Sequence, residues 1–524
     1  MRWLYYFISI ASILMVTLIY QFWSPIIYSL IILVPYILIG LWDVFSFKHT
    51  ILRNYPVIGH FRYFFEYIRP EIQQYFIEND KDGSPYSREI RSLIYQRAKK
   101  ERDTIAFGTQ RDISAIGYQF SYHSLNPKIV AAEKARVMFG GEECKKPYNA
   151  SRLNISGMSF GALSPNALRA MNKGAKKGNF AHNTGEGGIS PYHLEGGGDL
   201  IWQIGTGYFG CRKNNGRFDE KIFSEKAKMD VVKMIELKLS QGAKPAHGGV
   251  LPAVKVTEEI AKIRLIQQGK DVISPPNHPE FSNPIGLMQF VAKLRKLSGG
   301  KPVGFKLCIG KRSEFMGICK AMLETGITPD FITIDGAEGG TGAAPVVYSN
   351  RLGTPINEAL VFVNNCLVGA NLRDKIKVVA SGKIATGYDM IVKLAFGADA
   401  CNVARAMMFA VGCVQSLHCN TNCCPTGVAT QNEHRWSSLH VASKYLRVAN
   451  FHHGTIDAFL ELLGAMGKAD PSELLPEDIR KYVDVNQSKD YASIYPMLNP
   501  GELLSKKKPP EFLTDWQNAS ANSF

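Results

Sequence analysis

The sequence has no long block of basic residues, although 61 Lys and Arg against 46 Asp and Glu give it a formal net charge of +15. The positive residues are spread over the whole length, which argues against an arm that binds nucleic acid. The low hydrophobicity of a disordered chain is also absent, since 45% of the 524 residues are hydrophobic. We therefore expect about two to four domains, or one large barrel with attachments, and a charge that suits anionic ligands or an anionic membrane face.

Charged residues are absent from one long stretch, Trp3 to Trp42. Two apolar runs, residues 3–20 and 26–42, flank the uncharged segment QFWSP, and each is just long enough to span hydrocarbon. A secretory signal would have one shorter core followed by polar sequence, so a transmembrane hairpin is the better interpretation, with two buried core helices as the alternative. Arg2 before the hairpin and Lys48 and Arg53 after it predict a two-pass protein of the cytoplasmic membrane with its main body in the cytoplasm.

Three further segments are expected after the hairpin of residues 1–47. Residues 48–120 have aromatic and aliphatic side chains at helical spacing, which predicts an amphipathic connector that lies on the membrane surface or packs on the main body. Residues 121–455 are the predicted main domain. Residues 456–524 are predicted to form a helical, proline-rich tail.

Short apolar segments alternate with amphipathic helical stretches from about Leu153 onward. The candidate strands are LNISGMS, NFAHNTG, LIWQIG, VVKMIELKL, DVISPP, PVGFKLCIG, FITIDGAEGG, IKVVASG and DACNVARAM. Their alternation with helices predicts an α/β fold, a (β/α)8 TIM barrel, and a doubly wound open sheet is the alternative.

Glycine-rich loops follow the candidate strands, among them GMSFGALS, HNTGEGG, AKPAHGG, GAEGGTGAA and ASGKIATG. In barrels of this kind the reactive groups gather at the carboxyl ends of the strands, and glycine lets the backbone approach a flat or phosphorylated ligand. Ser381, Gly382 and Arg405 follow the last two strands, where such barrels bind phosphate. Arg405 could instead pair with a surface carboxylate.

Four of the ten cysteines lie within GCVQSLHCNTNCCPTGVATQ, residues 412–431. In a reducing cytoplasm these thiols do not predict a disulfide framework. A cluster this tight indicates metal ligation or redox chemistry.

Taken in order, these motifs resemble the FMN-binding domain of the glutamate synthase large subunit. The resemblance rests on SGMSFGALS, HNTGEGG, QGAKPAHGG, ISPPNH, GAEGGTGA, SGKIATGYD and the cysteine-rich stretch, and it covers roughly residues 100–470. The sequence is identified as a stand-alone, membrane-anchored member of the glutamate synthase-related FMN proteins.

The resemblance implies two cofactors, FMN over the barrel mouth and a three-iron, four-sulfur cluster. The family's C-x5-C-x4-C spacing is matched by Cys413, Cys419 and Cys424, and three thiolates on an irregular loop can converge on one soft cluster. Cys423 departs from the pattern; it would point away, replace Cys424 as a ligand, or act as a reactive thiol. Zinc, with His418 as a fourth ligand, and inert thiols are the alternatives.

The resemblance also assigns the flavin contacts. A loop of Gly157, Met158 and Ser159 would lie beside the ring, with the polar side chains of Asn183 and Gln203 next to it. A second, glycine-rich loop of Gly339, Gly340 and Thr341 would lie near the ring. The phosphate end would be contacted by Ser381, Gly382 and Arg405.

Four charged residues are the candidates for catalysis and substrate binding. Lys238 and Lys306 are each predicted on a strand, where an unpartnered lysine is rare, and either could stabilise reduced flavin or bind a substrate carboxylate. Lys244 and Lys306 are the expected contacts of a dicarboxylate. Glu186 could be an acid or base, although we favour a role in orienting its glycine loop. The alternative for the two strand lysines is an ion pair, with Glu236 for Lys238 and Asp335 for Lys306. His182 and His278 could shuttle protons, but a lone histidine is more often a satisfied loop residue.

The implied reaction is the reduction of an imine, formed from 2-oxoglutarate or a related oxo acid and ammonia or an amine, to an amino acid. We expect no glutaminase domain before the barrel and no β-helix after it, so a separate subunit could supply the ammonia. We also expect no strand-linked G-x-G-x-x-G motif for a nicotinamide cofactor, and ferredoxin, a reductase subunit or a membrane quinol would supply the electrons. The alternatives are an FMN-dependent 2-hydroxy-acid dehydrogenase or oxidase, and a non-catalytic electron-transfer subunit.

Overall fold

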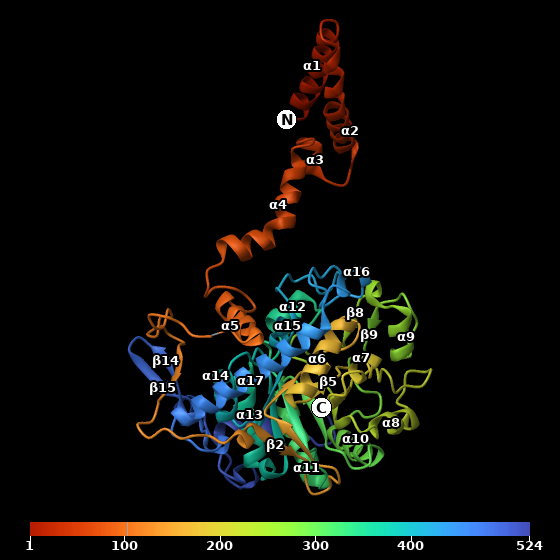
Figure 1. Cartoon of the computed structure of the whole chain (residues 1–524). Helices are drawn as coiled ribbons and strands as arrows, with labels where there is room; N and C mark the ends of the chain where they lie inside the picture. The colour runs from red at the N-terminus through yellow and green to blue at the C-terminus, as the bar shows by residue number, and fades with distance from the viewer. Residues whose placement is uncertain (102) are drawn as a thin grey trace. The chain divides into compact units, whose positions relative to one another are not determined.

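The computed structural model describes residues 1–101 and 103–524. They form two compact units, Met1–Arg88 and Glu89–Phe524, which we call unit 1 and unit 2 (Figure 1). Each unit is described by itself.

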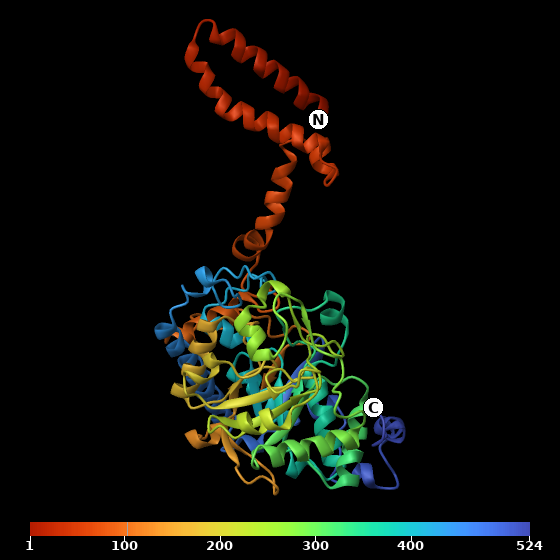
Figure 2. The same cartoon turned by 90° about the vertical axis from the view of Figure 1, so that its right-hand side faces the viewer.

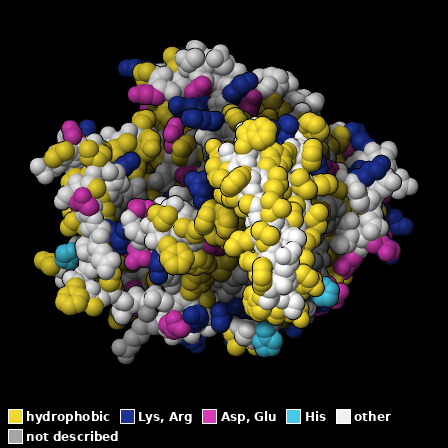
Figure 3. Space-filling model, turned by 90° about the horizontal axis from the view of Figure 1, so that it is seen from above, with side chains coloured by type: hydrophobic (Ala, Val, Ile, Leu, Met, Phe, Trp, Pro, Cys, Tyr) yellow, Lys and Arg dark blue, Asp and Glu magenta, His cyan; other side chains and the backbone are white. Residues whose placement is uncertain are grey.

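Unit 1 consists of helices. They are α1 (Arg2–Tyr20), η1 (Ser24–Ser29), α2 (Leu30–Phe45), α3 (Thr50–Asn54), α4 (Gly59–Ile72) and η2 (Gln73–Ile77). Residues 2–20 and 24–45 are long and apolar enough to cross a membrane, and only 11% and 6% of these two segments are buried. Large apolar side chains are exposed along both helices (Figure 3).

Two contacts define the shape of unit 1. The Tyr5 ring of α1 lies against Gly40 of α2, so closely that a Cβ at Gly40 would be 2.2 Å from a ring carbon. At the end of α2 the buried Asp43 carboxylate accepts a hydrogen bond from the Val57 backbone N–H at 2.9 Å and contacts the His60 ring at 2.9 Å. Asp43 therefore ties the start of α4 to the end of α2.

Unit 2 is built around a closed barrel of parallel strands (Figure 2). The strands, in barrel order, are β4 (Leu153–Ile155), β5 (His182–Asn183), β6 (Leu200–Ile204), β7 (Val232–Lys238), β10 (Val303–Leu307), β11 (Phe331–Asp335), β12 (Lys377–Ser381) and β13 (Ala400–Val403), which pairs with β4. Nearly all of their residues are buried, as expected for a parallel sheet covered on both sides. The predicted (β/α)8 barrel is confirmed, and closure between β13 and β4 excludes the open sheet.

Helices surround the barrel, as the alternating pattern predicts. They are α6 (Pro165–Gly178), α7 (Pro191–Leu194), α8 (Glu220–Ala227), α10 (Pro284–Leu297), α11 (Arg312–Thr325), α12 (Val346–Arg351), α13 (Ile356–Gly369), α14 (Gly387–Ala395), α15 (Arg405–Val411), α16 (Glu433–Trp436) and α17 (Val441–Ala465). The sequence sets the ends of α6 directly: the Ser164 side chain accepts from the Ala167 N–H at the start, and Asn179 adopts a left-handed conformation at the end.

One candidate strand, DVISPP, is not part of the barrel. Its residues Val272–Ile273 form β9, which pairs with β8 (Val250–Leu251) in an antiparallel hairpin. The hairpin belongs to an insertion between β7 and α10 that also contains η4 (Ala253–Lys255) and α9 (Glu258–Arg264). Ile273 is 64% exposed, so this segment does not have the two buried faces of a barrel strand.

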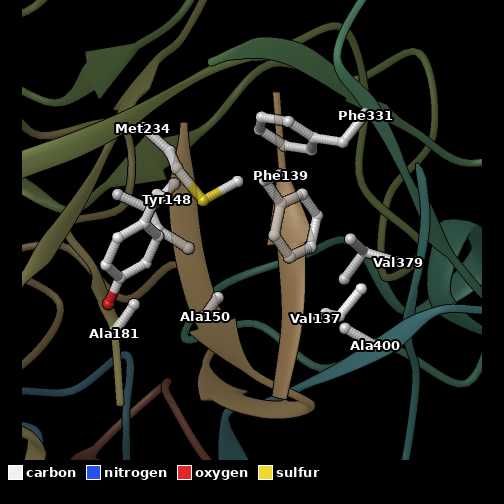
Figure 4. Close-up of a cluster of buried hydrophobic side chains, with 10 residues drawn as sticks. Val137, Phe139, Tyr148, Ala150, Ala181, Met234, Phe331, Val379 and Ala400 are labelled. Atoms are coloured by element: carbon white, nitrogen blue, oxygen red, sulfur yellow. The ribbon is translucent and has the colours of Figure 1, made fainter. Parts of the chain in front are cut away.

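The amino end of the barrel is closed by a hairpin that we did not predict. Its strands β2 (Arg136–Phe139) and β3 (Tyr148–Ser151) pair antiparallel. Their inward side chains, including Phe139 and Tyr148, pack on residues in or beside barrel strands (Figure 4). The Phe139 ring meets Phe331 edge-on, with 5.7 Å between the ring centres.

The segments around the barrel are less helical than expected. Before the barrel, α5 (Arg88–Lys99) is helical, but β1 (Gln119–Ser121) is a strand that pairs with β14 (Ile479–Asp484), and β14 pairs in turn with β15 (Gln487–Asp490). Two helices, α18 (Tyr491–Ile494) and α19 (Pro510–Asn518), follow. The region 456–524 thus contains a hairpin as well as helices, and α17 runs across its predicted start.

Candidate active site

The loop after β4 lies at the carboxyl end of the barrel, where two side chains approach its backbone closely. A Cβ on Gly157 would lie 2.8 Å from the Gln203 amide nitrogen and 3.0 Å from the Asn183 amide oxygen. Gly185 has φ +64, and a Cβ there would lie 2.6 Å from the Ser159 nitrogen. Glycine is required at positions 157 and 185 because neighbouring atoms leave no room for a Cβ. The structure also brings the predicted residues at 157–159, 183 and 203 together.

Glu236 organises the amides of this group. Its carboxylate, 1% exposed, accepts hydrogen bonds from Asn183 at 2.8 Å, from Gln203 at 2.6 Å and from the Thr333 hydroxyl at 2.7 Å. One buried acceptor therefore fixes the orientation of two predicted flavin contacts. From the sequence, Glu236 is expected only as the alternative ion-pair partner of Lys238.

Lys238 pairs with Glu186, not with Glu236. Its ammonium lies 2.8 Å from the Glu186 carboxylate and 2.6 Å from the Gln241 amide oxygen. Glu186 lies between two glycines, since a Cβ at Gly205 or Gly249 would come within 2.5 or 2.0 Å of its carboxylate. Burial opposes ionisation of Glu186, but the charges of Lys238, Arg264 and Lys244 hold its pKa below the usual value. An ionised, paired Glu186 favours the orienting role.

Lys306 has the alternative partner that its sequence position suggests. Its ammonium lies 3.3 Å from Asp335, whose carboxylate also accepts the Gly242 N–H at 2.9 Å. Burial alone would lower the pKa of Lys306, but the Asp335 and Glu236 carboxylates raise it above its ordinary value. Lys306 and Lys238 are paired across β10 and β7, so both ammonium groups lie at one level of the barrel.

Lys244 differs from these two lysines because its ammonium donates to a neutral group, the Ala343 carbonyl, at 2.6 Å. Burial lowers the pKa of Lys244 to about 8, and the nearby Lys238 charge acts in the same direction. A cation bonded to a carbonyl is better suited to meet a substrate carboxylate than one already paired with an acid.

The predicted phosphate end lies where β12 and β13 finish. The Ser381 hydroxyl lies 3.4 Å from the Ser156 hydroxyl, and Gly382 has φ +151. Arg405 donates to the Glu338 carbonyl, and a Cβ on Gly340 would lie 2.8 Å from the Arg405 side chain. Gly340 and Thr341 are exposed, whereas Gly339 is half-buried, so this loop forms an outer edge of the group.

A small cavity of about 20 Å³ lies beside the charged residues, lined in part by Glu186, Lys238, Gln241 and His247. A larger groove of about 660 Å³ shares Leu239, Ser240, Ala246 and Pro276 with it. The buried Gln241 amide nitrogen has no hydrogen-bond partner among the residues that the structure describes. A bound ligand with a hydrogen-bond acceptor at this position would satisfy this donor.

One residue of this region was missed, and the expectation that the sequence has no strand-linked G-x-G-x-x-G motif needs correction. Arg264, buried in α9, donates to the Ser159 hydroxyl at 3.2 Å and to the Phe160 carbonyl at 2.9 Å. The segment GTGYFG, residues 205–210, has the G-x-G-x-x-G spacing of dinucleotide-binding loops. However, Tyr208 and Phe209 are buried and the next helix begins only at Glu220, so the segment does not open a helix as that motif requires.

The two histidines near the barrel mouth are neutral packing residues. His278 contacts the Tyr208 hydroxyl at 3.0 Å and the Lys238 carbonyl at 2.8 Å, and burial lowers its pKa to about 4. The centre of the His182 ring lies 5.2 Å from that of the His193 ring, with the two rings tilted, and burial holds the pKa of His182 well below the usual value. Neither arrangement argues for a proton shuttle.

The cysteine-rich loop follows α15. Cys424 is buried and Cys423 is exposed, so the adjacent pair has one inward thiol. Burial acts to raise the pKa of Cys424, but N–H groups of Ala429, Thr426 and Val428 and the Thr426 hydroxyl lower it overall. Burial raises the pKa of Cys413 to about 12. Within residues 1–101 and 103–524, no three Cys, His, Asp or Glu side chains are already assembled as a metal site.

Comparisons with known proteins cover this region. The family described as "Conserved region in glutamate synthase" matches residues 90–469. The chain is 39% identical to the glutamate synthase large subunit-like protein YerD of Bacillus subtilis, over 82% of this chain and 90% of that protein. It is 35% identical to the archaeal glutamate synthase (NADPH) of Methanocaldococcus jannaschii, over 66% and 67%. It is 32% identical to the archaeal-type glutamate synthase (NADPH) of Thermotoga maritima, over 60% of this chain and 59% of that enzyme. Among solved structures, a mandelate oxidase variant has 12% identity and a TM-score of 0.42, over 80% of this chain and 97% of that one.

Proposed function

The chain belongs to the glutamate synthase family of oxidoreductases, and from this premise we propose that it reduces an imine of 2-oxoglutarate, or of a related oxo acid, to the amino acid. The imine forms from the oxo acid and ammonia or an amine. The observation that carries the proposal is the group formed by the buried residues Lys238, Lys306, Lys244 and Asp335 with the half-buried Glu186. It lies at the barrel mouth, inside the region that matches the family.

FMN is the cofactor that we assign to the mouth. Gly157, Met158 and Ser159 would face the ring, with the Asn183 and Gln203 amides beside them. The support is that the Gly157 backbone approaches two amides more closely than a larger residue would allow, and that Glu236 fixes the orientation of these amides. When bound, FMN supplies the hydride for the imine carbon.

The phosphate end of FMN has a separate set of contacts. Ser381, Gly382 and Arg405 would hold the phosphate, and Gly339, Gly340 and Thr341 would close the outer edge. The close approach of Gly340 to Arg405 supports this assignment.

The charged residues divide the work on the substrate. Lys244 binds a carboxylate of the oxo acid, and Lys306, held by Asp335, binds the other end or the electron-rich edge of the flavin. Reduction of the imine also requires a proton at nitrogen, and the Lys238 ammonium, which is paired with Glu186, is the donor that we assign. The groove next to the cavity admits the substrate.

An iron-sulfur cluster is the second cofactor of the proposal. Cys413, Cys419 and Cys424 would hold it, and the N–H donors around Cys424 fit a sulfur atom that carries negative charge. Because these thiols are not assembled in the described residues, the support comes from their chemistry and spacing. The cluster would pass electrons from a separate donor, which is ferredoxin, a reductase subunit or a quinol.

Membrane attachment by α1 and α2 is also part of the proposal, with unit 2 on the cytoplasmic side. The support is the exposure of both apolar helices and of Phe61, Phe64 and Phe65 on α4. Such an amphipathic helix suits the interface between lipid and water.

The experiment is a single turnover under anaerobic conditions. The purified protein is reduced chemically, and flavin absorbance is followed after 2-oxoglutarate is added with and without ammonium. We expect reoxidation only when both are present, with glutamate as the product. Bleaching of the oxidised flavin by 2-hydroxy acids would favour the dehydrogenase, and no reaction with either substrate would favour an electron-transfer subunit.

A further inference from the structure

Lys255 is a buried lysine that the reaction described above does not use. It ends η4, in the insertion between β7 and α10, and only 2% of it is exposed. A lysine is almost never buried this completely without an anionic partner.

Its ammonium connects the flavin loop to the cysteine loop. It donates to the Ala162 carbonyl at 2.8 Å, to the Ala429 carbonyl at 3.1 Å and to the Cys419 carbonyl at 3.3 Å. Ala162 follows the segment assigned to the flavin ring, and the other two carbonyls lie on either side of Cys424 in the sequence. All three N–H donors of one side chain are therefore used to hold two loops together.

These three acceptors are neutral, so they satisfy the donors without neutralising the charge. Two of these acceptors belong to the cysteine loop, so the ammonium lies against the segment that holds the predicted cluster ligands Cys419 and Cys424. A buried cation is costly unless an anion offsets it, and three thiolates around an iron-sulfur cluster form such an anion.

We propose that Lys255 is a positioning residue that fixes the cysteine loop against the flavin loop and whose charge favours the reduced cluster. The inference rests on the cluster assignment of the proposed function. Reduction adds negative charge to the cluster, and a fixed cation nearby makes that addition more favourable.

The test compares Lys255→Met with a matched control, Lys301→Met. Lys301 is also buried, 5% exposed, and its ammonium donates to two backbone carbonyls, those of Ala227 at 2.6 Å and Met229 at 2.7 Å. Iron and FMN content, thermal unfolding and a spin-resonance redox titration of the cluster are measured on the full-length protein.

We expect Lys255→Met to keep its FMN and to lower the ratio of reduced to oxidised cluster about tenfold at a fixed potential. That is the order of effect expected when a unit charge is removed near an anion at an effective dielectric constant of about 20. We expect Lys255→Arg to restore the ratio and Lys301→Met to leave it unchanged. An unchanged ratio in Lys255→Met overturns the inference while the cluster assignment stands.

Two other outcomes are decisive. A wild-type protein that binds FMN but no iron overturns both the cluster assignment and this inference. If Lys255→Met does not fold, the Lys255→Arg variant tests the inference instead. A ratio of reduced to oxidised cluster equal to that of the wild type would support the inference. Failure of both variants to fold would assign Lys255 a role in folding alone.

Discussion

Replacing Glu236 with alanine tests whether one buried carboxylate organises the flavin contacts. The change removes the acceptor of three hydrogen bonds, from Asn183, Gln203 and Thr333. Each bond to a charged group contributes about 1.5–3 kcal/mol, and the orphaned donors cost about 1–3 kcal/mol each unless water reaches them. Since the new cavity would admit water, which satisfies the orphaned donors, only the three bonds are lost, and we expect the free energy of unfolding to fall by at least about 4.5 kcal/mol.

The effect on FMN follows from the two amides. Without Glu236, the Asn183 and Gln203 side chains lose the contact that orients them. If each gives the flavin one ordinary hydrogen bond of about 1 kcal/mol, the loss of both is about 2 kcal/mol, or roughly 30-fold in Kd.

The assay is a titration of apoprotein with FMN, followed by flavin fluorescence, together with urea unfolding. Glu236→Gln is the matched variant, since it keeps an oxygen for the two amides and should retain most of the affinity. An unchanged FMN Kd in Glu236→Ala would refute the reasoning, because the amides would then be oriented without the carboxylate.

Four further outcomes are expected. Phe139→Ala should lower the free energy of unfolding, measured in urea, by about 3–5 kcal/mol. It should leave the FMN Kd unchanged, because the Phe139 ring packs at the end of the barrel opposite the flavin site. A higher FMN Kd in this variant would contradict that arrangement. The side chain of Lys244 is protonated below its pKa of about 8. The KM for 2-oxoglutarate should therefore rise about tenfold per pH unit above that value. A Lys244→Met variant with the same pH profile would exclude this lysine as the cause. Cys419→Ser should remove the iron-sulfur absorbance and retain the flavin, and unchanged iron content would count against the cluster ligands. Full-length protein should stay with membranes after a carbonate wash, whereas residues 89–524 alone should be soluble and yellow; a full-length protein released by the wash would disprove the anchor.

Much of the fold could be predicted because its signals are local. Eight of the nine candidate strands lie in the barrel, since buried apolar runs separated by amphipathic helices have few other arrangements. The segment DVISPP resembled a barrel strand because two adjacent apolar residues are enough for a short strand, whether it lies inside a barrel or in a strand pair outside it. The β2–β3 hairpin was missed because its function, closing the amino end of the barrel, depends on neighbours far away in sequence.

The candidate site shows the same division. The glycines at 157 and 185 were found as loop residues, and the structure adds the atoms that each approaches. Lys306 pairs with Asp335, an alternative that the sequence suggested. Lys238 pairs with Glu186 although Glu236 lies two residues away on its own strand, because the Glu236 carboxylate is taken up by donors from three other strands.

The sequence by itself determined the alternation of strands and helices, the glycine loops at the strand ends, the cysteine spacing and the two apolar helices. Each of these depends on residues within one short segment, where periodicity and backbone preference act. Only the tertiary structure decided which acid meets which lysine, that Glu236 fixes two amides, and that Lys255 connects two loops. Those contacts exist because closing the barrel brings distant segments to one end, and hydrogen-bond partners are chosen by distance in space, which no local pattern encodes.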